Sequence, residues 1–370
     1  MRSVILLVVL LAACRGGHPH DAGPMPDTGP PPDAGPFVLP PAPEACTSFA
    51  SRGPQSITVG SALDVAAAAA PTELAVAFVD RGAGDALSLR VQRLTPTGAR
   101  MGSPVEVAPI GTGTAGGAAI ATDGSVYVAC GGGMPAGIVC GSVPVGGGIA
   151  RRGASIPGGT DPSLAFGAGG FVLAYLESGG IRVQALDASA ARVGVPRSIA
   201  TGTGSPSIAP TDDGYAIGYA KDAAYVQLLD DGGAPAGPAL SLGTSRAQTR
   251  VAVTFATGDF GAAWIDGSGV AVASFGRRTP VNFGGPDASF GRVAIAPAQN
   301  GVVASFSSFA GVLGVAAIGT SGVSLGPTVT VPVGWNDTPH AIAAGPAGFV
   351  VVAAAGSSLS PLETWLLSCP

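Results

Sequence analysis

Short apolar segments recur along most of the chain, each just after a glycine-containing or polar turn. Copies of one such segment follow one another at intervals of about 42 to 52 residues. They occupy residues 74–78, 126–130, 171–175, 215–219, 260–264, 302–306 and 349–353. Because each copy is short, rich in small and β-branched residues and bounded by turns, we expect each to be one β-strand of a repeated unit.

Each unit contains further strands around this segment. A segment of small residues precedes several copies, at 163–166, 207–209, 293–296 and 340–343. Alternating apolar and polar residues, typical of a half-buried strand, follow at 89–92, 181–184 and 225–228. After a Gly/Pro turn comes a short outer strand, at 105–107, 198–199, 240–242 and 329–331. The pattern therefore predicts four strands in each unit.

Four strands in a period of about 40 to 50 residues are the hallmark of a β-propeller blade. Small side chains suit the innermost strand, where blades crowd together at the axis. We therefore expect an all-β fold, a single seven-bladed β-propeller over residues 45–370. A β-solenoid usually has a shorter period, and a two-sheet sandwich gives no reason for seven repeats. The resemblance is to propeller repeats in general, because the blade signatures of the Trp-Asp, kelch and Asp-box families do not occur.

The two ends of the predicted ring complement each other. The seventh unit ends after its third strand, at residues 365–369, whereas residues 56–59 stand alone before the first unit. We expect residues 56–59 to serve as the outer strand of the seventh blade, because this pairing removes an open sheet edge.

Four of the five cysteines fit the same ring. Cys130 ends the second strand of the second blade and Cys140 lies in the next strand, so we predict a disulfide across this hairpin. Cys46 and Cys369 lie at the two ends, where the closing strand should meet the last blade. We expect them to form a second disulfide that clasps the ring, since exported proteins commonly carry such bonds.

The first fourteen residues have the features of an export signal. Arg2 supplies a positive charge, and residues 3–13 are apolar but too short to cross a hydrocarbon core of about 30 Å. Leu11-Ala12-Ala13-Cys14 resembles the lipobox of bacterial lipoprotein precursors at all four positions. The resemblance implies removal of a signal peptide, residues 1–13, and acylation of Cys14, which would then hold the protein on membrane lipid. An ordinary signal peptide with a chance cysteine is the alternative.

The resemblance also bears on location. Arg15 follows the cysteine, where lipoproteins retained at the inner membrane have Asp, so we expect the outer membrane or the cell surface. Residues 14–44 are rich in Pro, Gly and Asp, including three Asp-x-Gly-Pro repeats, and proline at this density favours an extended chain. We expect a disordered tether there. His18 and His20 fall within it and are not expected to form a metal site.

Composition excludes some classes of function. Hydrophobic residues make up 46% of the chain and charged residues 11%, which is unlike a disordered protein. The net charge is −5 and basic residues form no stripe, so we expect no nucleic-acid partner. We expect the propeller to be a monomer.

Residues suited to catalysis are sparse. His340 is the only histidine of the predicted propeller, at the start of an inner strand, and we expect it to be structural. No Gly-x-Ser-x-Gly motif occurs, and no pair of cysteines has the spacing of zinc ligands. The sequence therefore predicts no catalytic residue, no cofactor and no metal centre.

Acidic residues form the best candidate ligand face. Four of them, Asp80, Glu177, Asp222 and Asp266, fall where second strands turn into third strands. Three more acidic residues lie in loops that lead into inner strands, namely Asp161, Asp287 and Asp337. These loops should emerge on the same face of the propeller. Trp335 is the aromatic residue beside them. Such carboxylates could hold Ca²⁺ or a cationic ligand. Turn chemistry is the stronger alternative, because Asp hydrogen-bonds its own backbone in tight turns.

Three functions fit these observations. The first is a non-catalytic, membrane-anchored propeller that binds an envelope protein or polymer, an expectation that rests on fold analogy. The second is a glycan-acting hydrolase or lyase that uses carboxylates at the channel mouth. The third is a structural envelope protein without a discrete ligand.

Overall fold

The computed structural model describes residues 42–57, 61–202, 204–246, 249–284, 288–308, 310–334, 338–354 and 361–370. The chain divides into two units, Met1–Pro36 and Phe37–Pro370. The predicted signal peptide, Cys14 and the predicted tether up to residue 41 lie outside the described residues. So do three residues of the predicted ligand face, Asp287, Trp335 and Asp337.

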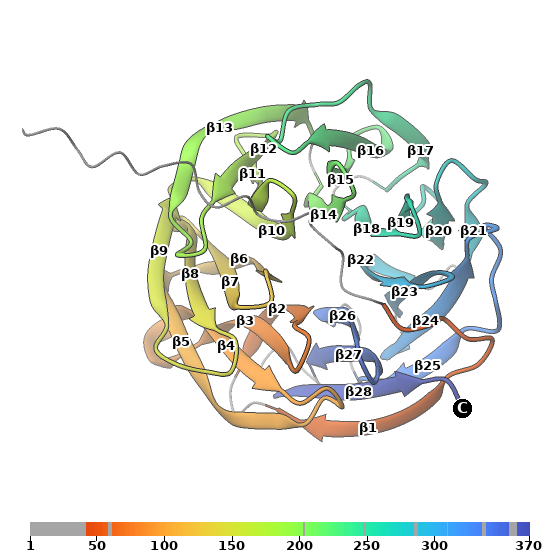
Figure 1. Ribbon diagram of the computed structural model, residues 1–370, viewed down its shortest axis with the longest axis horizontal. Helices are drawn as coiled ribbons and strands as arrows, with labels where there is room; N and C mark the ends of the chain where they lie inside the picture. The colour runs from red at the N-terminus through yellow and green to blue at the C-terminus, as the bar shows by residue number, and fades with distance from the viewer. Residues whose placement is uncertain are drawn as a thin grey trace, which may run out of the picture. The chain divides into compact units, whose positions relative to one another are not determined.

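Seven four-stranded antiparallel sheets surround a central axis, which confirms the predicted seven-bladed propeller (Figure 1). Blade 1 consists of β2 (Ala62–Ala69), β3 (Leu74–Arg81), β4 (Ala86–Leu94) and β5 (Arg100–Thr112), with the short 3-10 helix η1 (Ala83–Asp85) before β4. Blade 2 consists of β6 (Thr114–Thr122), β7 (Val126–Met134), β8 (Gly137–Pro144) and β9 (Arg151–Ile156). Blade 3 consists of β10 (Gly159–Gly167), β11 (Gly170–Glu177), β12 (Gly180–Leu186) and β13 (Arg192–Thr201).

The second half of the ring repeats the arrangement. Blade 4 consists of β14 (Ser207–Thr211), β15 (Gly214–Ala220), β16 (Ala223–Asp230) and β17 (Leu240–Thr244). Blade 5 consists of β18 (Ala252–Ala256), β19 (Asp259–Ile265), β20 (Ala271–Phe275) and β21 (Val281–Asn282). Blade 6 consists of β22 (Ala288–Ala298), β23 (Gly301–Ser308), β24 (Val312–Gly319) and β25 (Val329–Pro332). Blade 7 consists of β26 (His340–Gly345), β27 (Gly348–Ala354), β28 (Leu362–Ser368) and β1 (Ala50–Ser56).

The strands lie where the repeat predicts them. All seven copies of the recurrent apolar segment fall in the second strand of a blade, and the small-residue segments fall in the innermost strand. Second strands are buried on both faces, because neighbouring blades pack against both sides of each sheet. For this reason they are continuous apolar runs and not alternating ones.

The N-terminal strand closes the ring, but it lies earlier than predicted. β1 pairs with β28 in antiparallel register, from Ala50 opposite Ser368 to Ser56 opposite Glu363. The prediction of residues 56–59 therefore overlaps the real strand only at Ser56. An outer strand faces solvent on its free side, and most residues of β1 are exposed. Its sequence thus lacks the apolar pattern on which the prediction relied, while the neighbouring Ile57 is buried outside the strand.

Both predicted disulfides are present. Cys46 and Cys369 are joined across the blade that closes the ring, with their Cα atoms 5.7 Å apart. Cys130 and Cys140 lie directly opposite each other in β7 and β8, and both are fully buried.

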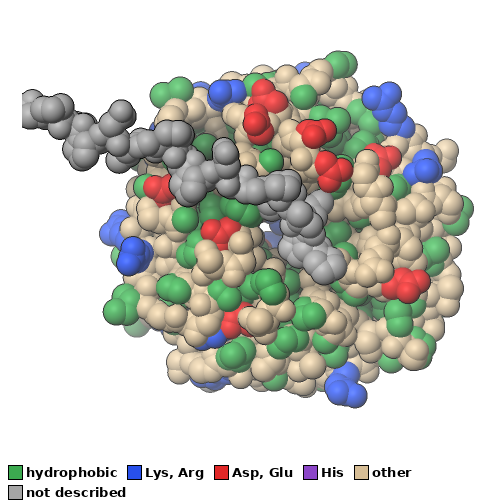
Figure 2. All heavy atoms as spheres, viewed as in Figure 1, with side chains coloured by type: hydrophobic (Ala, Val, Ile, Leu, Met, Phe, Trp, Pro, Cys, Tyr) green, Lys and Arg blue, Asp and Glu red, His purple; other side chains and the backbone are tan. Residues whose placement is uncertain are grey.

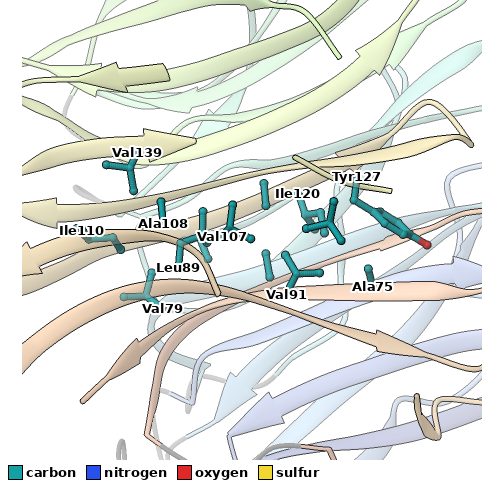
Figure 3. Packing of buried hydrophobic residues seen from close by; sticks show 14 of the residues in the cluster. Ala75, Val79, Leu89, Val91, Val107, Ala108, Ile110, Ile120, Tyr127 and Val139 are labelled. Carbon is teal, nitrogen blue, oxygen red and sulfur yellow. The ribbon is translucent and has the colours of Figure 1, made fainter. Parts of the chain in front are cut away.

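The hydrophobic core is divided among the interfaces between blades. Each of the buried clusters combines residues of two neighbouring blades, so each blade contributes to two clusters. Figure 3 shows the cluster between blades 1 and 2, which includes Leu89, Val91 and Val107 of blade 1 and Ile120 and Tyr127 of blade 2. Closing the ring therefore buries one more interface, between blades 7 and 1.

A buried glutamine recurs in the third strands of three blades. Gln184 donates its side-chain amide to the carbonyls of Ala185 (2.9 Å) and Val193 (2.8 Å). Gln227 donates in the same way to Leu228 and Gly237, both at 2.8 Å. Equivalent bonds from Gln92 reach Arg93 (2.7 Å) and Met101 (3.1 Å). Each glutamine thus ties its strand to the start of the outer strand or to the chain just before it.

Candidate functional site

The predicted acidic residues that the structure describes are held mainly by partners nearby in their own blades. Asp80 contacts Arg90 at 3.3 Å and accepts a hydrogen bond from the backbone of Ser61. Glu177 pairs with Arg182 at 2.7 Å. Both side chains thus have arginine partners within their own blades.

Asp222 and Asp266 behave in the same way. Tyr225 donates its hydroxyl to Asp222 at 2.9 Å. Asp266 accepts hydrogen bonds from the backbone and hydroxyl of Ser268 and from the backbone of Val270. Burial raises the pKa of Asp266, but these hydrogen bonds outweigh it and hold the pKa below its usual value. This is the turn chemistry that competed with the ligand-face interpretation.

The visible acidic side chains on the face in Figure 2 are scattered among uncharged ones. Among the residues that the structure describes, no three His, Cys, Asp or Glu side chains gather closely enough to hold a metal ion. The described part of the chain also has no helix that is long and apolar enough to cross a membrane.

A cavity of about 150 Å³ lies on the central axis instead. The innermost strands of all seven blades line it, largely with Ala, Val, Ile and Leu side chains. Four polar residues also line it, namely Ser163, Ser207, Arg250 and His340. The residues around it are thus mostly small and aliphatic, with four polar side chains among them.

These polar residues lie in or just before the first half of their inner strands. Two inner strands have a register shift nearby, β2 between Ala62 and Asp64 and β10 between Thr160 and Ser163. Such irregularities redirect side chains locally, here those of Asp64 and Ser163.

Three of the polar side chains join neighbouring blades around the channel. The Asp64 carboxylate accepts a hydrogen bond from the backbone N–H of Ala118 at 2.9 Å. The Ser163 hydroxyl oxygen accepts from Ile208 at 3.0 Å, and that of Ser207 accepts from Val253 at 3.2 Å. Because both serine oxygens act as acceptors here, their hydroxyl protons remain available for donation.

Charged side chains from several blades gather at the same end of the channel. Arg292 of blade 6 contacts Asp64 of blade 1, with Nη1 and Oδ1 2.8 Å apart. Asp161 of blade 3 accepts a hydrogen bond from Ser205 of blade 4 at 2.7 Å. Arg250 of blade 5 is attracted by both Asp64 and Asp161. Of the predicted ligand-face residues that the structure describes, Asp161 is thus the one associated with the channel.

Arg250 differs from its neighbour Arg292 in its hydrogen bonding. Its Nε is buried and has no hydrogen-bond partner among the described residues. Burial lowers the pKa of the guanidinium, and the two aspartates only partly oppose this. A guanidinium remains charged in proteins, so Nε of this half-buried side chain is an unsatisfied buried donor.

His340 is the second unsatisfied group. It is 6% exposed, and its Nδ1 lies 3.1 Å from the carbonyl of Thr338, which can only accept, so Nδ1 carries the proton. Burial lowers the pKa of the imidazole to about 4, with the backbone of Thr338 and Ser305 opposing the shift and Arg292 and Arg250 adding to it. Nε2 makes no hydrogen bond to any described residue. His340 is therefore uncharged at neutral pH.

Most of this site escaped the sequence interpretation, which considered only Asp161 and His340. Polar residues flank a proline within or at the start of three inner strands, in Asp161-Pro162-Ser163, Ser205-Pro206-Ser207 and Thr338-Pro339-His340. An Arg-Val-Ala sequence recurs at residues 250–252 and 292–294. These two repeated patterns were the available signals, since residues at equivalent places in a propeller lie around one axis.

Comparison with known proteins assigns neither a family nor a function to this chain. No protein-family model matches the sequence, and no curated protein matches it. The function is therefore inferred from the residues of this protein alone.

Proposed function

We propose that this protein is an exported bacterial lipoprotein whose seven-bladed propeller acts as a non-catalytic binding platform. The observation that carries the binding role is the end of the channel, where polar side chains from most of the blades surround a cavity. Two of their nitrogen atoms, Arg250 Nε and His340 Nε2, are buried and lack partners among the described residues. A ligand that supplies those partners would offset the cost of leaving them unsatisfied.

The same geometry favours binding over catalysis. General acid–base catalysis near pH 7 works best with a group whose pKa is near 7, and the pKa of His340 is about 4. Hydrolysis of glycans requires a carboxyl group that can donate a proton. Both oxygens of Asp64 already accept hydrogen bonds, from Arg292 and from the backbone of Ala118.

The membrane anchor is the second part of the proposal. Its support is the lipobox-like Leu11-Ala12-Ala13-Cys14, the apolar segment before it and the two disulfides, which suit an oxidising compartment. We expect growing cells to incorporate a palmitate analogue into the protein, and Cys14→Ser to abolish this labelling. Labelling that persists in Cys14→Ser would place the acyl group elsewhere and contradict the anchor.

The binding role is tested by a thermal-shift screen of the full chain, made with its disulfides and purified in mild detergent. The panel contains divalent cations, envelope glycans, peptidoglycan fragments and small anions. A ligand specific for the folded state adds about 2.7 kcal/mol at one hundred times its Kd. We expect at least one ligand whose effect is lost in Arg250→Met but kept in Arg152→Met, which alters an exposed arginine on the outer strand β9.

Two results would contradict this role. A ligand that stabilises Arg250→Met as strongly as the unaltered protein would bind away from the channel. Absence of any stabilisation, together with absence of crosslinks to envelope proteins or polymers in intact cells, would favour a structural component without a ligand.

A further inference from the structure

We propose that the channel end binds an uncharged sugar ring, whose hydroxyl groups accept hydrogen bonds from some groups around the axis and donate hydrogen bonds to others. This inference rests on the proposed binding role and specifies the chemical class of the ligand. Its support comes from the two unsatisfied nitrogen atoms, the free edges of the inner strands, the balance of charge and the open cavity.

The two unsatisfied nitrogen atoms need partners of opposite kinds. Arg250 Nε can only donate a hydrogen bond, and it has no acceptor among the described residues. His340 carries its proton on Nδ1, which faces the carbonyl of Thr338, so its Nε2 can only accept. A carboxylate offers acceptors alone, and an ammonium group offers donors alone. A hydroxyl group does both, so a ligand with neighbouring hydroxyls supplies both missing partners.

The backbone around the axis also offers both donors and acceptors. In the described sheets the innermost strand pairs with the second strand alone, as β10 does with β11 and β26 with β27. Its other edge borders the channel and presents N–H and C=O groups that no strand of its own sheet satisfies. The neighbouring blade satisfies some of them, as Asp64 does for the N–H of Ala118. The remaining groups help to explain why the surface that the cavity exposes is mostly polar, although most of its lining residues are aliphatic.

The charges at this end balance without a ligand. Among the described residues, the charged groups that act on the Arg250 guanidinium are Asp64, Asp161 and Arg292, so two positive charges face two negative ones. Arg292 and Asp64 already contact each other at 2.8 Å. The pKa of His340 is about 4, so the imidazole adds no charge at neutral pH. An ionic ligand would therefore bring an uncompensated charge into a partly buried place, which an uncharged ligand avoids.

The cavity admits a six-membered ring. Its volume is about 150 Å³. A closed cavity of about this volume in another protein binds a benzene ring. The cavity here is open to solvent, so its volume sets no upper limit on the ligand, and substituents of the ring can project out of the channel. The channel end can therefore take one sugar ring at the end of a longer glycan.

The experiment is calorimetric titration of the full chain at neutral pH and constant ionic strength, in a polyoxyethylene detergent that carries no sugar head group. The probes are the methyl glycosides of glucose, galactose and mannose, which differ in the orientation of single hydroxyl groups. We expect saturable binding of at least one of them, with a Kd on the order of millimolar for so small a ligand. Titration of the corresponding free sugars shows whether the site accepts a substituent on the anomeric oxygen, as the end of a glycan requires.

The effect of charge is measured on the same ring. The methyl uronide replaces the primary alcohol of the neutral glycoside by a carboxylate, and the methyl glycoside of the amino sugar replaces one hydroxyl by an ammonium group. We expect both to bind at least about tenfold more weakly than the neutral glycoside, because each leaves a charge uncompensated.

Variants locate the binding. Arg250→Met removes the unsatisfied donor but keeps an unbranched side chain, and we expect it to weaken binding of the neutral glycoside by about tenfold or more. His340→Phe removes the acceptor and should weaken binding by a comparable factor. Arg152→Met on β9 is the matched control and should leave the Kd unchanged. Because His340 is buried, His340→Phe is titrated only if its thermal unfolding is cooperative, and otherwise Arg250→Met decides.

The possible outcomes separate this inference from the proposed function. No binding of any neutral glycoside or free sugar, equal binding of the charged derivatives, or an unchanged Kd in Arg250→Met would overturn the sugar assignment. Binding of a free sugar without binding of its glycoside would support it and identify a free monosaccharide as the ligand. If an anion or Ca²⁺ bound instead and Arg250→Met changed that affinity, the sugar would be wrong while the binding role of the channel end would stand. If every probe failed here and in the broader screen, both would be overturned.

Discussion

The disulfide between Cys46 and Cys369 joins residues separated by 323 positions, whereas Cys130 and Cys140 are separated by 10. A disulfide restricts the unfolded chain by an amount that grows with the logarithm of the loop. At 25 °C this entropic model gives at most about 6 kcal/mol for the long loop and about 3 kcal/mol for the short one. Because Cys369 is exposed and Cys46 half-buried, Cys46→Ala with Cys369→Ala removes little packing. We therefore expect the double variant to lose up to about 6 kcal/mol, a large part of the 5–15 kcal/mol typical of a folded protein.

The assay is equilibrium unfolding in urea, followed by the fluorescence of the buried Trp264 and Trp365. The free energy of unfolding should also depend more steeply on the urea concentration in the double variant. The reason is that an unfolded chain without the disulfide-closed loop exposes more surface. The control replaces Cys130 and Cys140 by Ala. Both residues are fully buried, so the control loses packing as well as a short loop, but its urea dependence should change little.

Two results would refute this reasoning. One is a loss below about 1 kcal/mol for the Cys46 and Cys369 double variant, because the entropic term would then be absent. The other is a large loss with an unchanged dependence on urea, because the effect would then arise in the folded ring and not in the unfolded chain.

Three further predictions concern single side chains. Gln184→Leu should cost about 1–3 kcal/mol in urea unfolding, because two hydrogen bonds from a buried side-chain amide are lost. Gln299→Leu, at an exposed site, should cost almost nothing, and equal costs would contradict the role of the recurrent glutamine. Burial raises the pKa of Glu73, but hydrogen bonds from Arg93 and Gly146 outweigh it and the pKa is lowered. The stabilising effect of the Glu73 carboxylate is thus present above its usual pKa of 4.5 and is lost on acidification below it. The urea midpoint of Glu73→Gln should therefore fall less steeply below pH 4.5 than that of the unaltered protein. An identical acid dependence of the two proteins would disprove this. The pKa of His340 is about 4 instead of 6.5. Between these two pH values only the unfolded chain binds the proton, so the free energy of unfolding falls as the pH falls. His340→Gln should flatten this dependence, and an NMR titration of the imidazole near pH 6.5 would contradict it.

The fold was predictable where burial leaves a pattern in the sequence. Second strands such as β7 and β23 lie between two neighbouring blades, so their residues are mostly apolar or small and recur at the blade period. Outer strands have solvent on their free edge and leave a weak pattern. For this reason the outer strand of blade 1 was predicted only at residues 105–107, whereas β5 spans Arg100–Thr112. The closing strand β1 was likewise predicted too late in the chain.

The candidate site was less predictable because it depends on contacts between blades. Asp64 and Arg292 are 228 positions apart, and only the closed ring brings them to 2.8 Å. Counting acidic residues at strand ends found the turns, where Asp266 binds its own neighbours, and not the channel. The recurrence of Arg-Val-Ala at Arg250 and Arg292 is a usable signal, once equivalent positions are known to surround an axis.

The pairing of β1 with β28 also determines when the ring can close. Ala50 lies opposite Ser368, so a chain emerging from the ribosome has made every other blade before β1 finds its partner. Until then β1 is a strand without a sheet, and the interface between blades 7 and 1 is open. During this interval a second copy can supply its own β1, which gives a domain-swapped dimer. An intermolecular bond between Cys46 and Cys369 would then lock that dimer covalently, so the same disulfide that secures the monomer makes the outcome depend on how crowded the newly made chains are.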